Sequence, residues 1–216
     1  MTAEAPAREQ GSPNGHIALP YGEFLASKRI ASRDAGLSVD PGALHPLLHP
    51  FQRHITDWAL RKGKAAVFAD CGLGKSPIQL QWAQQVHEHS GRDVLILAPL
   101  AVSKQTVREG VKFDVPVNIC RRQEDVRPGV NIANYEMLQH FDPAEFGGIV
   151  LDESSCLKSY SSVYRQQITE FASSLPSRLA CTATPAPNDL IELINHAEFL
   201  SVMQGKEIIA LFFTQD

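Results

Sequence analysis

Short apolar runs alternate with stretches of helical spacing through most of this chain of 216 residues. Residues 94–98, with the sequence Val-Leu-Ile-Leu-Ala, are apolar throughout, which is typical of a strand that is buried on both faces. Strands of this kind that alternate with helices form a mostly parallel sheet with helices on both of its faces. The sequence therefore predicts an α/β fold with this architecture.

The pattern also predicts the order of the elements and the division of the chain. The expected strands are residues 65–69, 94–98, 117–120, 130–134, 149–151 and 178–182. The expected helices are residues 21–32, 51–61, 75–88, 103–113, 135–141, 161–174, 189–202 and 207–213. We expect residues 1–20, which are rich in Ala, Glu, Pro, Gly and Ser, to be a disordered lead. Residues 21–50 should pack as a helix and a loop on the domain that residues 51–216 form.

Composition excludes several classes of protein. The formal net charge is −4, so the chain has no overall basic field that would indicate a small nucleic-acid-binding module. No apolar stretch has the pattern of a signal peptide or a membrane span, and we therefore expect a cytoplasmic protein without membrane partners. The cysteines are far apart and form no Cys-x-x-Cys pair, so neither a disulfide framework nor a zinc site is indicated. We expect buried, reduced thiols at Cys71, Cys120, Cys156 and Cys181.

The segment between the first strand and the following helix has the sequence Ala-Asp-Cys-Gly-Leu-Gly-Lys-Ser over residues 69–76. Strand, glycine-rich loop and helix in this order are the context of a phosphate-binding P-loop. In such a loop Lys75 would reach the β- and γ-phosphates, and the Ser76 hydroxyl would bind Mg²⁺. Ala69 replaces the usual first glycine of the pattern. The alternative is a glycine-rich turn with an incidental lysine.

An apolar strand ends in two adjacent carboxylates at Asp152 and Glu153. Neighbouring carboxylates repel each other, so the pair needs a cation or a division of roles. Beside a P-loop, Asp152 would hold Mg²⁺ and Glu153 would orient, or accept a proton from, the water that attacks the γ-phosphate. The alternative is a strand that ends in a solvated acidic turn.

Two weaker patterns complete the set. Residues 182–185, Thr-Ala-Thr-Pro, follow the last expected strand, and their hydroxyls could hydrogen-bond the acidic loop; a simple turn is an equal alternative. Gln52 lies at the start of a helix, and its amide offers both the donor and the acceptor that the edge of adenine requires; by itself it would be a surface residue. Polar residues thus follow the expected strands at the edge where parallel sheets bind ligands, namely at Asp70, Pro99, Asn134, Asp152 and Thr182.

In this order and at these intervals, the four patterns resemble the first RecA-like lobe of a superfamily-2 helicase or translocase. Gln52 resembles the Q motif, residues 69–76 motif I, residues 152–155 the DEAD/DEAH box with serines in its last two places, and residues 182–184 motif III. The runs Gly-Leu-Gly-Lys at 72–75, Ala-Pro-Leu at 98–100 and Asn-Tyr-Glu at 134–136 resemble the Swi/Snf-like branch. Asp-Glu-Ser-Ser and Thr-Pro-Ala-Pro-Asn at 184–188 are most similar to its phage and prophage members.

The resemblance implies an ATP-driven motor that uses ATP and Mg²⁺ and acts on DNA, in a bacterial or phage-infected cytosol. It implies catalytic roles for Lys75, Asp152 and Glu153, metal binding by Ser76 and Asp152, and coupling of nucleotide to DNA by Thr182, Ala183 and Thr184. The implied nucleotide contacts are Gln52, Asp70, Cys71, Gly72, Leu73, Gly74, Lys75 and Ser76. Motif Ia implies sequence-independent contacts to nucleic-acid phosphates by Pro99, Leu100, Ser103 and Lys104.

Motors of this family have a second RecA-like lobe with an arginine finger, which the sequence after residue 188 does not resemble. We therefore expect a truncated or split motor, with the second lobe as a partner in cis or in trans and poor activity for this lobe alone. Two other hypotheses remain at this stage. The chain could be a module that binds nucleic acid or a partner without turnover, or a P-loop phosphotransferase, although the scattered arginines offer no lid for the latter.

Overall fold

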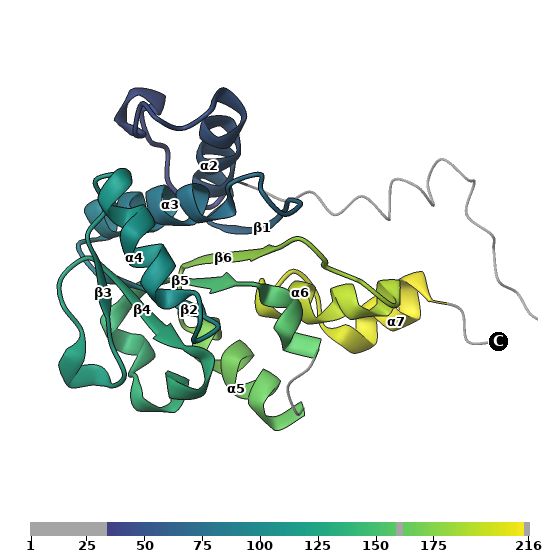
Figure 1. Ribbon diagram of the computed structural model, residues 1–216. Coiled ribbons are helices and arrows are strands. Elements are labelled where there is room, and N and C mark those ends of the chain that lie inside the picture. The colour runs from purple at the N-terminus through teal and green to yellow at the C-terminus, as the bar shows by residue number, and fades with distance from the viewer. Residues whose placement is uncertain (1–33, 159–161, 214–216) are drawn as a thin grey trace, which may run out of the picture. The chain divides into compact units, whose positions relative to one another are not determined.

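The computed structural model describes residues 34–158 and 162–213. The described residues form one six-stranded sheet in the order β1-β6-β5-β2-β4-β3, and every neighbouring pair is parallel (Figure 1). The predicted α/β fold is confirmed. The strands are β1 (Lys64–Phe68), β2 (Asp93–Ala98), β3 (Val117–Ile119), β4 (Val130–Asn134), β5 (Phe146–Asp152) and β6 (Ser177–Thr182).

Helices connect the strands. The α-helices are α2 (Pro50–Lys62), α3 (Lys75–Ser90), α4 (Ser103–Lys112), α5 (Ser162–Ser173), α6 (Leu193–Phe199) and α7 (Gly205–Phe212). The 3₁₀ turns are η1 (Pro41–Ala43), η2 (Gln123–Asp125), η3 (Tyr135–His140), η4 (Pro143–Glu145), η5 (Ser154–Lys158) and η6 (Leu190–Glu192). The disordered lead expected over 1–20 and the helix expected over 21–32 lie outside the described residues.

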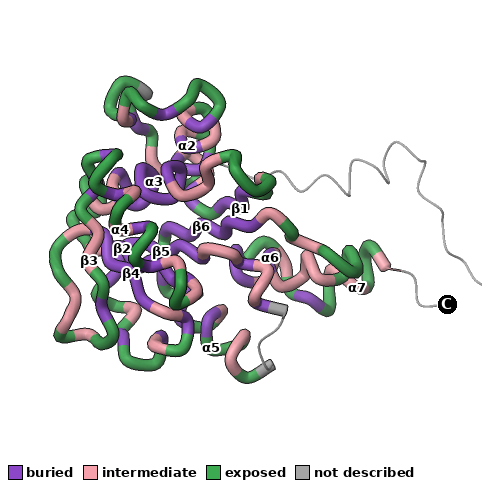
Figure 2. Tube along the Cα trace, viewed as in Figure 1, coloured by how far each residue is buried: buried purple, intermediate pink, exposed green. Residues whose placement is uncertain are grey.

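The sheet separates two apolar layers, and its strands β2, β5 and β6 are buried over most of their length (Figure 2). Along β2, Val94 and Ile96 pack in the layer that includes Trp82 of α3. Leu95 and Leu97 point the other way, into the layer that includes Ile168 of α5 and Phe199 of α6. This alternation of side chains explains why the strand is apolar at every position, since both faces of the sheet are covered.

Three expected elements differ from the structure. The helix predicted over 135–141 is instead the 3₁₀ helix η3. The single helix predicted over 189–202 is instead η6 followed by α6. The Asp189 carboxylate accepts a hydrogen bond from the Ile191 N–H and starts a tight turn, and Ser201, at φ 53°, ends the helical region early. Strand β5 begins three residues before the predicted strand, at Phe146, because Gly147 and Gly148 extend it. A Cβ at Gly148 would lie 3.1 Å from Val86 and 3.2 Å from Ser177, so glycine permits close packing there.

Residues 34–49 lie against α2 and α3. Leu44 and Leu48 are buried in the same apolar layer as Trp82, and the His45 N–H donates to Gln81 Oε1 at 2.9 Å. The division of the chain at residues 20 and 50 stays a prediction.

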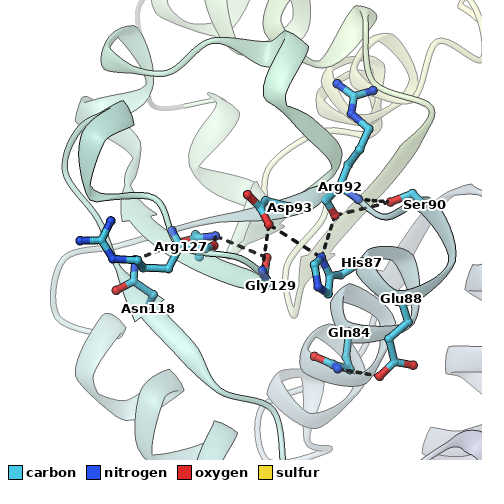
Figure 3. Close-up of polar contacts among 10 residues, drawn as sticks. Gln84, His87, Glu88, Ser90, Arg92, Asp93, Asn118, Arg127 and Gly129 are labelled. Carbon is cyan, nitrogen blue, oxygen red and sulfur yellow. Dashed lines mark hydrogen bonds and ion pairs between the residues drawn. The ribbon is translucent and has the colours of Figure 1, made fainter.

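A network of polar contacts connects the amino ends of β2 and β4 to the end of α3 (Figure 3). Asp93, the first residue of β2, accepts a hydrogen bond from the Gly129 N–H at 2.8 Å and lies 3.8 Å from His87 Nδ1. Gly129 has φ 110°, a conformation that favours glycine. The Asp93 carboxylate thus joins the end of α3, the start of β2 and the turn before β4, at the sheet edge opposite the sequence motifs.

Candidate active site

The glycine-rich loop of residues 69–74 connects β1 to α3. Gly72 and Gly74 have φ 83° and 73°, which side chains rarely adopt. A Cβ at Gly74 would lie only 2.2 Å from Gln52 Nε2. The loop places backbone N–H groups at the amino end of a helix of 16 residues, where the helix dipole favours anions.

Lys75 is the first residue of α3, and its ammonium group folds back on this loop. Nζ donates to the Ala69 carbonyl at 2.9 Å and to the Asp70 carbonyl at 3.3 Å. Both acceptors are neutral carbonyl oxygens. Hydrogen bonds from the ammonium group to an anionic phosphate are charge-assisted and therefore stronger. A phosphate group bound in the loop would thus replace the carbonyls as the partner of Lys75 Nζ.

Gln52 of α2 contacts the glycine-rich loop, and its side chain is buried, with 5% of the residue exposed. Its Oε1 accepts from the His49 N–H at 2.9 Å, and its Nε2 donates to the Leu73 carbonyl at 3.1 Å. The structure therefore shows an amide that is engaged by the protein at both ends. The assignment of Gln52 to adenine recognition stays a prediction.

Asp152 ends β5, and its side chain is half-buried. Oδ1 accepts a hydrogen bond from Gln79 Nε2 of α3 at 2.7 Å. Burial raises the pKa of Asp152 above its usual range, while the Gln79 hydrogen bond and the charge of Lys75 act in the opposite direction. The backbone carbonyl of Asp152 accepts from the Tyr135 hydroxyl at 2.8 Å, which fixes the end of the strand.

Glu153 has φ 56°, a left-handed conformation that costs a non-glycine residue about 1–2 kcal/mol. Its Oε1 accepts hydrogen bonds from the hydroxyls of Thr182 at 2.6 Å and Ser155 at 2.8 Å. The Thr182 hydroxyl in turn accepts from the Thr184 N–H at 3.1 Å. The carboxylate of Glu153 is thus tied to the carboxyl end of β6, where residues 182–184 lie.

The glycine loop and Asp152 share one cavity of about 380 Å³, which Glu153 does not line; its size is within the usual range of ligand pockets. Six of the residues that line it come from the sequence patterns: Gln52, Gly72, Gly74, Lys75, Ser76 and Asp152. Leu47, His49, Glu109, Lys112 and Phe113 line it too; the sequence patterns do not include them. A larger cavity, of about 710 Å³, lies beside α5 and the start of α7 but contains none of these groups.

The donor groups of this cavity suit a hard cation. The Ser76 hydroxyl and the Asp152 carboxylate are oxygen ligands of the kind that Mg²⁺ prefers. Within the described residues no group of three or more His, Cys, Asp or Glu side chains could hold a metal by itself. A Mg²⁺ ion here would therefore take most of its ligands from phosphate and water, as it does in phosphoryl-transfer sites.

The expectation of buried thiols is wrong for one cysteine. Cys120 and Cys181 are buried within the sheet and Cys156 is half-buried, but Cys71 is exposed because it lies on the glycine loop. Burial raises the pKa of the Cys120 thiol to about 12 and that of Cys156 to about 11. All four thiols are free.

A second cavity lies at the carboxyl ends of β2, β3 and β4, and its volume is about 150 Å³. Leu100, Ser103 and Lys104 line it, as does Arg121, which the sequence patterns do not include. The Ser103 hydroxyl oxygen is buried and has no hydrogen-bond partner among the described residues. Pro99 precedes this cavity but is not among its lining residues. Arg121 follows the short strand β3, whose place beside β4 only the sheet order reveals.

No family model and no curated protein matches this sequence. Solved structures do match the fold. The SWI2/SNF2 ATPase core of Sulfolobus solfataricus in complex with double-stranded DNA has a TM-score of 0.67 and 20% identity, over 82% of this chain and 41% of that chain. The UvsW helicase of bacteriophage T4 has a TM-score of 0.59 and 13% identity, over 86% of this chain and 66% of that chain.

This chain has the RecA-like α/β fold of the structures that it matches. It spans about two fifths of the length of the SWI2/SNF2 core. At such low identity the likeness establishes the fold of the lobe, and what the lobe does has to be argued from its side chains. Among the residues that the model describes, no helix is both long and apolar enough to cross a membrane.

Proposed function

We propose that this lobe binds ATP with Mg²⁺ and belongs to an ATP-dependent DNA translocase or helicase. The observation that carries the proposal is the shared cavity, which Lys75 and Asp152 both line although they are far apart in the chain. A glycine turn with an incidental lysine would not require an acidic strand end beside it. A solvated acidic turn would not hold the half-buried Asp152 carboxylate in a hydrogen bond with Gln79 of α3.

In the proposed mechanism, the loop N–H groups and Lys75 bind the β- and γ-phosphates, and Ser76 and Asp152 hold the cation. Mg²⁺ would supply charge neutralisation on the phosphate oxygens. Glu153 accepts the proton of the attacking water. Its hydrogen bond to Thr182 links that carboxylate to residues 182–184, which supports the proposed coupling role of Thr182, Ala183 and Thr184. Hydrolysis at a useful rate would need a second RecA-like lobe as a partner.

The second cavity supports the nucleic-acid part of the proposal. Leu100, Ser103, Lys104 and Arg121 combine an unpartnered buried hydroxyl, the amino end of α4 and two cationic side chains. A backbone phosphate satisfies all three features without any reading of base sequence. The SWI2/SNF2 core that shares this fold was solved with double-stranded DNA. We also propose that the chain is related to the phage and prophage members of the Swi/Snf-like branch. We propose further that it acts in the cytoplasm.

Nucleotide binding by three variants tests this function. Lys75→Ala should weaken the binding of ATP with Mg²⁺ at least tenfold, because a charge-assisted hydrogen bond contributes about 1.5–3 kcal/mol. Glu153→Gln should bind ATP within about twofold of wild type yet lose roughly 10²-fold or more of any DNA-stimulated hydrolysis, as expected for a general base. Lys206→Ala on α7 serves as the matched control and should change neither quantity.

Titration calorimetry and a phosphate-release assay, each with and without DNA, measure these effects. Equal ATP affinity of wild type and Lys75→Ala would exclude the proposed phosphate site. Retained hydrolysis in Glu153→Gln would remove Glu153 from its role. DNA binding that is indifferent to ATP, without hydrolysis, would favour a binding module that does not turn over.

A further inference from the structure

One histidine outside every sequence motif contacts residues next to both the glycine loop and the acidic pair of the proposed ATP site. His196 lies on α6, which packs against η5 and is labelled in Figure 1, and it is only 4% exposed. Its Nε2 is 3.0 Å from the Ser154 hydroxyl, which is itself fully buried. Its ring meets the ring of Phe68 edge to face, with centroids 5.3 Å apart. Phe68 is the last residue of β1 before the glycine loop, and Ser154 directly follows the acidic pair.

The turn that His196 contacts is strained and is held from three sides. Glu153 is left-handed, and such a conformation persists only where the surroundings fix it. Tyr135 holds the carbonyl of Asp152, and Thr182 holds the carboxylate of Glu153. Ser154, the next residue, has its side chain hydrogen-bonded to His196, so α6 supplies the third support.

The chemistry of the ring suits this place. Burial lowers the pKa of His196, although a hydrogen bond with the backbone of Glu192 acts in the opposite direction. A neutral imidazole offers one donor and one acceptor. It can therefore pair with a buried hydroxyl without placing a further charge beside the two carboxylates.

We propose that His196 is a positioning residue for the acidic pair, which it holds through the Ser154 hydroxyl and so fixes the Glu153 turn against α6. The structural part of this inference stands on the contacts of His196. Its consequence for turnover rests on the proposed ATPase function. The test therefore has one readout that needs no nucleotide and one that does.

Hydrogen exchange of the 216-residue chain gives the first readout. His196→Phe keeps a ring against Phe68 but leaves the Ser154 hydroxyl unpaired, and Ser154→Ala removes that hydroxyl with little loss of volume. In both variants, the backbone amides of residues 153–157 should exchange about tenfold faster, the effect of one lost hydrogen bond. His196→Gln, which keeps a polar group within reach of the hydroxyl, should remain within about twofold of wild type.

The controls separate positioning from general loss of stability. The double variant should exchange no faster in this turn than either single variant, because both delete the same contact. His89→Phe, on the exposed end of α3, is the matched control and should leave the turn unchanged. Unchanged exchange at residues 153–157 in Ser154→Ala, or an equal rise over all strands, would overturn the proposal. If His196→Phe does not fold, Ser154→Ala still decides the result.

Steady-state kinetics give the second readout. Ser154→Ala and His196→Phe should lower kcat for the slow ATP hydrolysis expected of this lobe alone about tenfold, while KM for ATP stays within about twofold, since neither residue lines the cavity of the proposed ATP site. His196→Gln should restore most of kcat. An unchanged kcat beside faster exchange would overturn the role of His196 in turnover. A wild-type chain that neither binds nor hydrolyses ATP would instead contradict the proposed function, and the exchange result would still decide whether His196 fixes the turn.

Discussion

At the scale of single residues, the site contains a half-buried carboxylate, Asp152, whose loss of solvent opposes folding when it is charged. Burial raises the pKa of Asp152 in the folded chain. A carboxyl group with a raised folded-state pKa contributes stability that is fully present below its ordinary pKa and is lost as the pH rises through the raised value. At neutral pH the wild-type chain therefore lacks this contribution, which a bound cation would offset.

Asp152→Asn should make the free chain more stable at neutral pH while abolishing Mg²⁺-dependent ATP binding. Asparagine keeps the oxygen that accepts from Gln79 and removes the buried charge. We expect the Tm to rise by roughly 2–4 °C, or about 1 kcal/mol for a chain of this size. The difference from wild type should appear as the pH rises from about 4 towards 7.

Thermal melts across this pH range, with Asp57→Asn as the control for a partly exposed carboxylate, measure the effect. A variant that melts at or below the wild-type temperature at pH 7 would contradict the account of a destabilising buried charge. A variant that keeps Mg²⁺-dependent ATP binding would contradict the assignment of Asp152 to the cation.

At the scale of elements, Arg178 joins two helices through β6. Its guanidinium is almost fully buried. It donates to the Ser173 carbonyl at the end of α5 at 2.9 Å, and to the Phe199 carbonyl at the end of α6 at 2.7 Å. It also donates to the Leu175 carbonyl and the Ser201 hydroxyl. A cation at the carboxyl ends of two helices is favourable for both helix dipoles.

Arg178→Met should therefore destabilise the chain by about 3 kcal/mol or more, because methionine fills part of the volume but leaves four acceptors unpaired. The corresponding loss in Tm is roughly 6–12 °C. Chemical denaturation measures the free energy of unfolding, with Arg108→Met on the exposed side of α4 expected to stay within about 0.5 kcal/mol of wild type. A loss below about 1 kcal/mol would mean that water satisfies these acceptors.

Some features of the structure can be predicted from the sequence and others cannot. The strands were predictable because a parallel sheet covered on both faces requires apolar runs, and the glycine loop was predictable because its backbone requires glycine. Arg178 and His196 were not, because a polar residue that will be buried has the same local sequence signal as one on the surface. Their partners come from α5, α6 and η5, and no spacing along the chain reveals such contacts. The position of Arg121 in the lining of the second cavity could not be predicted either, because it depends on the place of β3 in the sheet order.

At the scale of the whole described domain, the carboxyl edge of the sheet carries both cavities side by side along the strand order. The cavity of the proposed ATP site includes the loop after β1 and the end of β5, and the second cavity includes the loop after β2 and the ends of β3 and β4. The amino edge of the sheet contains instead the hydrogen bonds by which Asp93 and Arg178 connect the strands to neighbouring turns and helices. The proposed binding sites and these stabilising contacts thus lie on opposite edges of one sheet.

Charge removal at the second cavity tests the DNA path. Lys104→Ala and Arg121→Ala should each weaken DNA binding similarly for all base sequences and lower the salt slope of log K by about 0.7–0.9. Arg122→Ala is the matched control, because Arg122 already lies within 3.5 Å of Glu124 and 3.8 Å of Asp125. Fluorescence anisotropy with single-stranded and duplex DNA over a range of salt measures the slopes. Slopes equal to wild type in both cavity variants would exclude this path.

The exposure of Cys71 on the glycine loop has a practical consequence. The other three thiols are wholly or partly buried, with raised pKa values, and an alkylating dye reacts with exposed thiolate in preference to buried thiol. Such a dye should therefore attach at this one position in the unmodified chain. Its labelling rate, slowed by any molecule that covers the loop, would provide an optical signal of ligand occupancy without an engineered cysteine.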